Sequence, residues 1–181
     1  MTAQLTVRHV RPADIPAIHA IYAHSVLHGT ASWEYEPPDL DEMRRRVEGL
    51  LERGFPYLVA EVDGAVAGYC YCGPYRPRAG YRYVVEDSIY VASNYQRRGI
   101  ARTLLATLIE EATQRGYRQM VAVIGDSANV ASIALHRALG FTHAGTLAGI
   151  GFKFGRWLDS VLMQRPLGAG SAAPPDHPSP A

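Results

Sequence analysis

A junction at residues 96–101, Gln-Arg-Arg-Gly-Ile-Ala, constrains what this chain can fold into more than any other feature of its sequence. It follows an apolar stretch at 88–91 and precedes apolar residues at helical spacing, at positions 100, 104, 108 and 112. The pattern predicts a strand and then a helix over about 97–114, which Gly116 ends. The first N–H groups of such a helix are unpaired, and its first turn carries a partial positive charge. Because Gly99 lets a ligand approach the backbone and two arginines add charge, the junction predicts a phosphate site.

Length and charge limit the kind of protein this can be. The 181 residues suffice for one domain with a full core and are too few for two ordinary ones. A formal net charge of +1 predicts no broad basic face for nucleic acid. No apolar run reaches the length of a membrane span, and the first residues do not resemble a signal peptide. We therefore expect a cytoplasmic protein without nucleic-acid or membrane partners.

The two cysteines, Cys70 and Cys72, lie two positions apart in an apolar run. On a strand they point to the same face, so they are badly placed to form a disulfide with each other. A Cys-x-Cys pair without a second cysteine pair or a nearby histidine is also a poor zinc site. We expect both thiols to be reduced and buried in the core, and we expect no metal.

The N-terminal part predicts one strand and two helices. Residues 5–9 alternate as a short strand, and Asp14 is expected to cap the helix that follows. A second helix opens at Asp39 with Glu42 three residues later, which resembles a capping box. The side chains expected to face inward are Ile15, Ile18, Tyr22 and Val26 in the first helix, and Met43, Val47, Leu50 and Leu51 in the second.

The rest of the chain predicts mainly strands. The pair Asp63–Gly64 is typical of a two-residue hairpin turn, here between strands at 57–62 and 65–72. The tail at 168–181 is rich in Gly, Ala, Pro and Ser and is expected to be disordered, which leaves a domain at 1–167. The elements expected after the junction helix are a strand at 118–124, a helix at 128–139, and strands at 141–150 and 152–163.

The junction resembles the Gln/Arg-x-x-Gly-x-Gly/Ala loop of the GNAT superfamily of N-acetyltransferases, which wraps the pyrophosphate of acetyl-CoA. Ala101 stands where glycine is commoner in that family. The predicted order, strand-helix-helix-strand-strand-strand and then helix-strand-helix-strand-strand, also matches the family fold. The resemblance implies an α/β (α+β) fold with a central, mixed, mostly antiparallel twisted sheet flanked by about four helices. It further implies acetyl-CoA as co-substrate.

The resemblance implies how acetyl-CoA would be held. The main chain of Ile89, Tyr90 and Val91 would contact the pantetheine arm. Asn129 and Ser132 resemble the family's Asn-x-x-Ser element, in which the Asn side chain contacts the arm; the alternative is a helix start capped by Ser127 or Asn129. The pyrophosphate loop would comprise Arg97, Arg98, Gly99, Ile100, Ala101 and Arg102.

Two residues are candidates for proton transfer. Glu86 precedes the cofactor-binding part of its strand, where a carboxylate could take a proton from the acceptor amine directly or through water. His136 stands where many relatives have a tyrosine that protonates the departing thiolate, and a histidine can serve near neutral pH. The alternatives are an ordinary charge at a strand start for Glu86, and a partly buried histidine bonded to a backbone carbonyl for His136.

Motifs along most of the domain resemble a narrower group, the phosphinothricin and methionine sulfoximine N-acetyltransferases. The resemblance implies transfer of an acetyl group through a tetrahedral intermediate to the α-amine of such amino-acid analogues, with Glu86 and His136 catalytic. The motifs include Glu61-Val-Asp-Gly64, Gly73-Pro-Tyr-Arg76, Glu86-x-Ser-x-Tyr-Val91, Leu135-His-x-Ala-Leu-Gly140, Gly145-Thr-Leu147 and Gly151-Phe-Lys153.

Such acceptors carry an α-carboxylate and a second polar or anionic group, so they require fixed cations. Arg76 and Arg78 lie in the loop before the Glu86 strand, and a guanidinium suits both groups. Tyr75, Tyr81 and Trp33 could form walls of the same pocket. The alternatives are solvated arginines and ordinary aromatic packing.

Two other functions stay open. The same fold could acetylate a protein N-terminus or a polyamine, although the loop with Arg76 and Arg78 is basic where a polyamine would need acidic groups. A catalytically inactive acyl-CoA sensor is the second alternative, and the presence of Glu86 and His136 argues against it. The resemblance also implies a homodimer.

Overall fold

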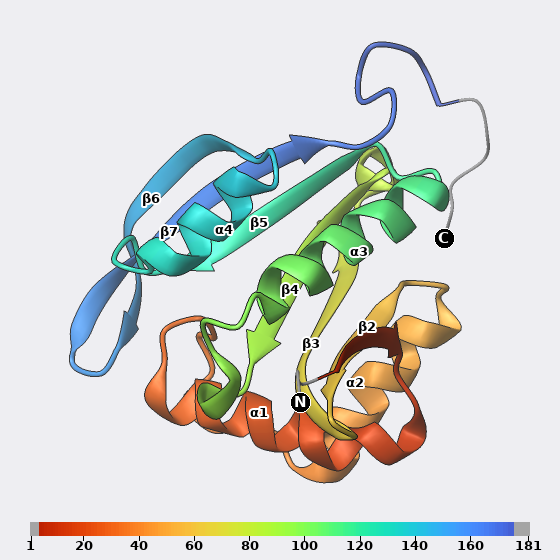
Figure 1. Ribbon diagram of the computed structural model, residues 1–181. Coiled ribbons are helices and arrows are strands. Elements are labelled where there is room, and N and C mark those ends of the chain that lie inside the picture. Colours follow the sequence, from red (N-terminus) through yellow and green to blue (C-terminus); the bar gives the residue numbers. More distant parts are fainter. Residues whose placement is uncertain (1–3, 176–181) are drawn as a thin grey trace.

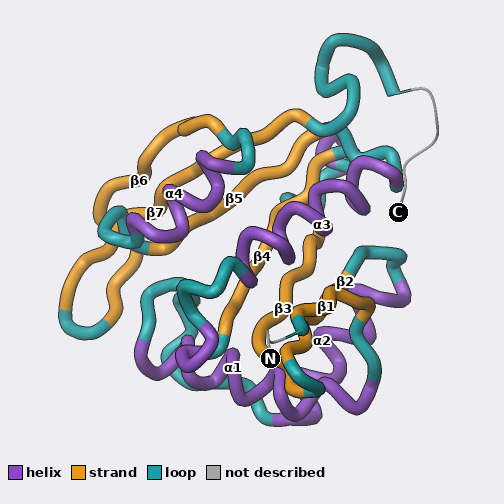
Figure 2. Tube along the Cα trace, in the orientation of Figure 1, coloured by secondary structure: helices purple, strands orange, loops and turns teal. Residues whose placement is uncertain are grey.

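The computed structural model describes residues 4–175 of the chain, which fold around a single twisted sheet (Figures 1 and 2). Three short 3₁₀ turns, Pro12–Asp14, Ala79–Tyr81 and Ser93–Tyr95, lie in the connections. The helices are α1 (Ile15–His28), α2 (Leu40–Glu52), α3 (Ile100–Gln114) and α4 (Val130–Ala138). The strands are β1 (Leu5–His9), β2 (Tyr57–Val62), β3 (Ala65–Pro74), β4 (Val84–Val91), β5 (Gln119–Gly125), β6 (Thr142–Lys153) and β7 (Arg156–Pro166). The predicted element order and the mixed, mostly antiparallel sheet are confirmed.

The sheet has seven strands in the order β1-β2-β3-β4-β5-β7-β6. All neighbouring pairs are antiparallel except β4 and β5, which are parallel. The β4–β5 pairing runs only from Val84 opposite Gln119 to Asp87 opposite Ala122. Beyond it β4 stays paired with β3, and β5 stays paired with β7, so the two central strands part from each other (Figure 1).

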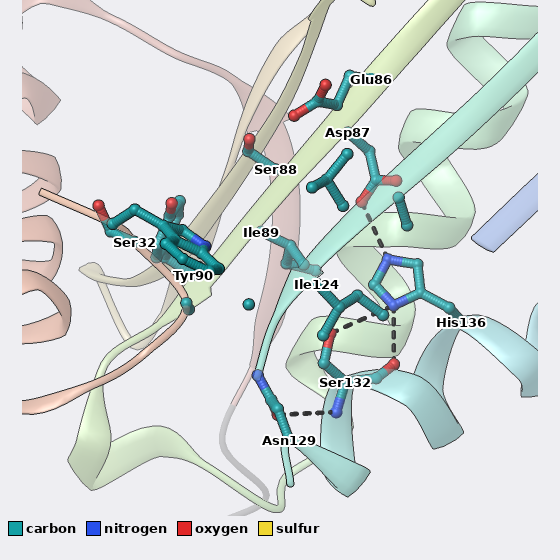
Figure 3. A pocket seen from close by; sticks show the side chains of 15 residues that line it. Ser32, Glu86, Asp87, Ser88, Ile89, Tyr90, Ile124, Asn129, Ser132 and His136 are labelled. Carbon is teal, nitrogen blue, oxygen red and sulfur yellow. Dashed lines mark hydrogen bonds and ion pairs between the residues drawn. The ribbon is translucent and has the colours of Figure 1, made fainter. Parts of the chain in front are cut away.

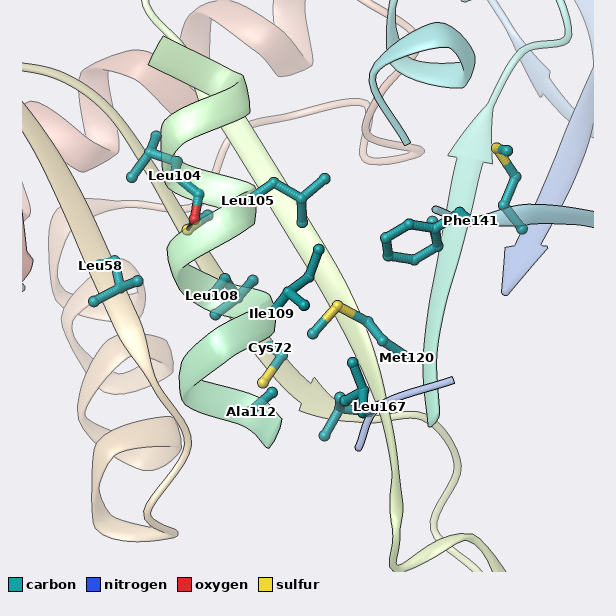
Figure 4. Packing of buried hydrophobic residues seen from close by; sticks show 14 of the residues in the cluster. Leu58, Cys72, Leu104, Leu105, Leu108, Ile109, Ala112, Met120, Phe141 and Leu167 are labelled. Carbon is teal, nitrogen blue, oxygen red and sulfur yellow. Dashed lines mark hydrogen bonds between the residues drawn. The ribbon is translucent and has the colours of Figure 1, made fainter. Parts of the chain in front are cut away.

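Each face of the sheet has its own core, because successive strand residues point to opposite faces. On one face α3 lies across the sheet and buries Leu104, Leu105 and Leu108 against Met120 (Figure 4). On the other face α1 and α2 cover the tyrosine-rich side of β2 and β3. The buried residues of this second core include Ile15, Ile18, Tyr22, Val26, Met43, Val47, Tyr57, Val59 and Tyr69.

The local predictions for the N-terminal part are mostly confirmed. Asp39 caps α2 by accepting a hydrogen bond from the Glu42 N–H at 2.7 Å. The hairpin turn at Asp63–Gly64 has φ values of 49° and 83°, as a two-residue turn with a right-handed strand twist requires. The cap predicted at Asp14 is wrong, because its carboxylate instead accepts two hydrogen bonds from the Arg8 guanidinium, at 2.7 and 2.9 Å. Leu51 was predicted to face inward and is 42 % exposed, because it lies past the edge of the buried stripe of α2.

Two boundaries in the C-terminal part differ from the predictions. Helix α3 begins at Ile100 and not near Arg97, because Arg97 and Gly99 adopt positive φ values of 61° and 79°. The turn between the last two strands was predicted near position 151, but β6 continues to Lys153. The chain reverses at residues 154 and 155, where φ is 51° and 73°.

The cysteines lie in the core, and Arg118 holds the start of the tail by hydrogen bonds. Cys70 and Cys72 are free thiols buried in the core under α3, as predicted, and burial raises the pKa of both. Residues 168–171 of the predicted tail form turns, and Arg118 donates to the Gly170 and Ala173 carbonyls at 2.9 and 2.7 Å. Residues 176–181 lie outside the described part of the chain. Within that part, we find no helix long and apolar enough to cross a membrane.

Candidate active site

A cavity of about 240 Å³ lies where β4 and β5 part (Figure 3). Its walls come from both strands, from the start of α4 and from the segment that follows α1. The lining residues are Ala31, Ser32, Trp33, Glu86, Asp87, Ser88, Ile89, Tyr90, Ala122, Val123, Ile124, Gly125, Asn129, Ser132 and His136. The parting of the strands therefore brings both predicted proton-transfer residues into one site.

The strand alternation of β4 gives the cavity two chemically different sides. Glu86, Ser88 and Tyr90 point toward the α1 and α2 side, where the Tyr90 ring contacts Tyr22 edge-on at 5.3 Å (Figure 3). Asp87 points to the opposite face, toward α4. A group bound between the strands would therefore have the Glu86 carboxylate on one side and Asp87 on the other.

Glu86 has the pKa expected of a general base. Burial and, to a smaller extent, the charge of Asp87 raise its pKa from 4.5 to about 7, while Arg76 opposes the rise. A carboxyl group with this pKa is partly ionised near neutral pH and can accept a proton from an ammonium group. This is the environment that the sequence interpretation of Glu86 required.

His136 is 2 % exposed and has both ring nitrogens engaged. Nδ1 donates to the Ser132 carbonyl at 2.7 Å, and Nε2 lies 3.0 Å from the Asp87 carboxylate. Burial lowers the pKa of the imidazole, but the hydrogen bond and charge of Asp87 outweigh it and leave the pKa raised. The arrangement is that of an imidazolium–carboxylate pair, and the edge of the ring packs against Phe141 at 5.0 Å. A proton can leave His136 only if one of these two hydrogen bonds breaks.

Asp87 is a site residue that the sequence interpretation missed. It is 7 % exposed, it lines the cavity, and His136 is its charged partner. Its second oxygen, Oδ1, is buried and has no hydrogen-bond partner among the described residues. The sequence could have indicated Asp87 as a site residue, because it is an aspartate on the core-facing side of a strand. A buried carboxylate at such a position requires a cation from another element.

The loop at 96–101 has the geometry of an anion site. The first helical hydrogen bond of α3 runs from the Thr103 N–H to the Gly99 carbonyl, so the N–H groups of residues 100–102 have no acceptor within the helix. Gly99 faces open space and has positive φ, which favours glycine there. Arg97, Arg98 and Arg102 are exposed around this turn, whereas Ile100 anchors it in the core.

Asn129 and Ser132 line the cavity and also perform the capping role considered as the alternative. The Asn129 side-chain oxygen accepts the Ser132 N–H at 3.2 Å at the start of α4 (Figure 3). This hydrogen bond uses the oxygen of the amide and leaves its NH₂ group available as a donor. The cap therefore orients the side chain that would contact a ligand.

The structure places the predicted acceptor-binding residues in two locations. Trp33 lies in the cavity wall. Tyr75 and Tyr81 pack edge-on at 5.6 Å in the connection between β3 and β4, outside the cavity lining, and Arg76 stacks over Tyr75 at 5.1 Å. Arg78 is exposed in the same connection, and Val91 also lies outside the lining. In the part of the chain that the structure describes, no group of His, Cys, Asp and Glu could hold a metal ion.

Comparison with known proteins identifies the family. Residues 7–162 match the model of the acetyltransferase (GNAT) domain. The chain is 55 % identical over 171 residues to a phosphinothricin N-acetyltransferase of Alcaligenes faecalis, covering 94 % of this chain and 87 % of that protein. It is 44 % identical over 163 residues to an L-methionine sulfoximine/L-methionine sulfone acetyltransferase of Salmonella typhimurium, covering 90 % and 95 %.

A solved structure gives the same result. The crystal structure of a phosphinothricin acetyltransferase from Sinorhizobium meliloti in complex with AcCoA has a TM-score of 0.94 and 47 % identity, covering 99 % of this chain and 96 % of that chain. The chain therefore belongs to the GNAT family of N-acetyltransferases. Within it, the chain is similar to the phosphinothricin and methionine sulfoximine acetyltransferases.

Proposed function

We propose that this enzyme transfers an acetyl group from acetyl-CoA directly to the α-amine of a small amino-acid analogue such as phosphinothricin or L-methionine sulfoximine or sulfone. The names of the relatives support this acceptor class. The observation that carries the proposal is a Glu86 carboxyl group with a pKa of about 7 in a cavity whose opposite side is built from the candidate cofactor residues.

The residues present fit acetyl-CoA. The free N–H groups of residues 100–102 and the exposed arginines Arg97, Arg98 and Arg102 would hold its pyrophosphate. The main chain of 89–91, which β5 no longer pairs with, and the Asn129 amide would hold the pantetheine arm. When bound, acetyl-CoA supplies an acetyl group activated as a thioester.

Glu86 would act on the acceptor. An α-amine is protonated at neutral pH and must lose a proton before it can attack a carbonyl group. Glu86 lies on the α1 and α2 side of the cavity and would receive that proton, directly or through water. Main-chain N–H groups of β4 would stabilise negative charge on the carbonyl oxygen.

The His136–Asp87 pair would act on the cofactor side. The departing thiolate needs a proton, and the pair holds one between Nε2 and the carboxylate at 3.0 Å. Because both ring nitrogens are engaged, release of the proton requires local movement of α4 or of the Asp87 side chain. We assign His136 the acid role with Asp87 as its partner.

The acceptor's anionic groups would meet Arg76 and Arg78 in the connection between β3 and β4. The charge of Arg76 acts on the pKa of Glu86, so this guanidinium is electrostatically linked to the proposed base. Exposed arginines that have not been neutralised by a carboxylate suit a carboxylate, phosphinate or sulfoximine group.

We also propose that the protein works as a cytoplasmic homodimer. Large apolar side chains are exposed on the β6–β7 hairpin, and a second copy would remove them from water. The exposed residues are Leu147, Ile150, Phe152, Phe154 and Trp157. Sedimentation velocity of the purified protein tests this proposal, and a concentration-independent monomer would contradict it.

Release of CoA thiol from acetyl-CoA tests the function. L-methionine sulfoximine and phosphinothricin should support turnover, while spermidine and a short peptide should not. Glu86→Gln should abolish turnover and keep affinity for CoA. Turnover with the peptide alone would indicate a protein N-terminal acetyltransferase, and binding of CoA without turnover of any amine would indicate a sensor.

A further inference from the structure

Lys153 is the single lysine in a chain with 18 basic residues, and it is buried. Only 2 % of it is exposed, at the last position of β6. Its ammonium group donates three hydrogen bonds, to the carbonyl oxygens of Val26 at 2.8 Å, Gly29 at 3.0 Å and Ser32 at 2.7 Å. All three donors are therefore satisfied by the end of α1 and the segment that follows it.

That segment, residues 29–35, forms the cavity wall that contains Ala31, Ser32 and Trp33. The Trp33 ring lies against Gly151 and Gly125, where a Cβ at Gly151 would fall inside the ring and a Cβ at Gly125 would approach Nε1 to 2.8 Å. The segment is held at further points. The Tyr35 hydroxyl donates to the Phe152 carbonyl, and the Ser32 and Tyr22 hydroxyls are hydrogen-bonded at 2.9 Å.

The geometry explains why a lysine occupies position 153. A compact ammonium group can direct three N–H donors at three convergent carbonyls, whereas the planar guanidinium of arginine presents its donors in a fixed fork. The partial negative charge at the end of α1 also favours a cation there. No carboxylate among the described residues forms an ion pair with Lys153, and burial lowers its pKa. The ammonium group also lies 5.0 Å from the centre of the Phe154 ring. Burying a cation without a carboxylate partner is costly, and its three hydrogen bonds to one segment indicate a positional role.

We propose that Lys153 is a positioning residue that fixes the 29–35 segment, so that Trp33 seats on Gly125 and Gly151 and sets the acceptor side of the cavity. The inference rests on the proposed function, because it assigns this wall to the acceptor. Ser32 lies beside Tyr90 on the same side of β4 as Glu86, whereas Asn129 and Ser132 lie across the cavity at the start of α4 (Figure 3). Loosening the segment should therefore impair use of the acceptor without changing the affinity for acetyl-CoA.

Lys153→Met and Lys153→Arg test whether the three hydrogen bonds from the Lys153 ammonium group to main-chain carbonyls are needed. We expect both variants to lose on the order of tenfold to a hundredfold in kcat/KM for the acceptor, since small misplacements of a binding wall have such effects. The KM for acetyl-CoA should stay unchanged. Gly151→Ala should likewise lower kcat/KM for the acceptor and leave the KM for acetyl-CoA unchanged, because its Cβ would displace Trp33. Gly145→Ala is the matched control on the same strand, since a Cβ there meets nothing within 4 Å.

A spectroscopic measurement follows the segment itself. The chain has two tryptophans, so Trp157→Phe leaves Trp33 as the single tryptophan, whose emission is separated from that of the tyrosines by excitation at the red edge of the absorption band. In that background Lys153→Met and Gly151→Ala should red-shift the emission of Trp33 and increase its quenching by acrylamide, whereas Gly145→Ala should not. Circular dichroism and thermal melts identify a variant that does not fold, in which case Gly151→Ala decides the test.

Unchanged Trp33 emission together with an unchanged acceptor KM in folded Lys153→Met would overturn the proposal. A rise in the KM for acetyl-CoA alone would also overturn it, because it would place the wall on the cofactor side. If the unmodified enzyme acetylates no acceptor, the proposed function fails. The fluorescence comparison still reports whether Lys153 positions Trp33, so the two failures are distinguishable.

Discussion

Asp87→Asn should move the acidic limb of the pH profile of kcat/KM to lower pH. Glu86 must be ionised to act as the base, so activity falls as the pH drops below its pKa. The rise of the Glu86 pKa from 4.5 to about 7 is due first to burial and second to the charge of Asp87. Because burial is the larger cause and Arg76 opposes the rise, we take the part due to Asp87 as on the order of one pKa unit, or about 1.4 kcal/mol.

His136 reduces the expected fall of the Glu86 pKa in Asp87→Asn. Without the Asp87 carboxylate, His136 loses the interaction that raises its pKa, and loss of its positive charge opposes the fall of the Glu86 pKa. We therefore expect the limb to move down by about 0.5 to 1 pH unit. The position of the limb is informative even if the maximum rate falls, because a purely structural defect lowers the rate without moving the limb.

The assay is CoA-thiol release with L-methionine sulfoximine at a subsaturating concentration. The range from about pH 5 to about pH 9 spans the Glu86 pKa of about 7 on both sides. Asp41→Asn is the control, since it removes one exposed carboxylate from the first turn of α2. That variant should leave the limb in place. An acidic limb that stays in place or moves upward in active Asp87→Asn would refute the assignment of Glu86 as a base coupled to Asp87.

Three further changes test other parts of the structure. His136→Gln should cost about 3–5 kcal/mol in urea unfolding, because it leaves Asp87 buried without its cation. Since the folded pKa of His136 is raised above 6.5, this loss is fullest below pH 6.5 and shrinks as the pH rises through the folded pKa. Gly99→Ala should raise the KM for acetyl-CoA, and it should lower the free energy of unfolding by about 1–2 kcal/mol because φ is positive there. The control Gly49→Ala, within α2, should raise the free energy of unfolding by about 0.5–1 kcal/mol. Leu108→Ala should cost about 2–5 kcal/mol in the same measurement, because Leu108 is completely buried under α3; a loss below 1 kcal/mol would contradict the packing.

The features that the sequence predicted correctly depend on local patterns. The order of helices and strands follows from apolar periodicity, the Asp39 cap and the Asp63–Gly64 turn follow from their own residues, and the resemblance in the 96–101 loop predicted the fold. Glu86 and His136, the two candidates for proton transfer, both line the cavity between β4 and β5.

The features that the sequence did not predict depend on contacts between distant segments. Asp87 is 49 residues from His136, and Lys153 is 121 residues from Ser32, so neither contact leaves a local signal. Gly151 was predicted to lie in the turn between the last two strands, since glycine is common in turns. The structure uses it instead to let Trp33 approach the backbone, and the turn forms three residues later. Similarly, the Asp14 carboxylate binds Arg8 of β1 because a charged partner outweighs a helix cap.

The short pairing between β4 and β5 has a mechanical consequence. The two strands share a ladder only from Val84 to Asp87, so β1–β4 and β5–β7 meet along the shortest seam in the described sheet. A ligand bound where β4 and β5 part would hydrogen-bond to both strands, as an additional strand would. It would thereby link the two parts of the sheet. Occupancy would therefore be coupled to resistance against opening, by RT ln(1 + [L]/Kd). The shortest strand pairing of the described sheet is therefore also the place where a bound ligand would stabilise the fold.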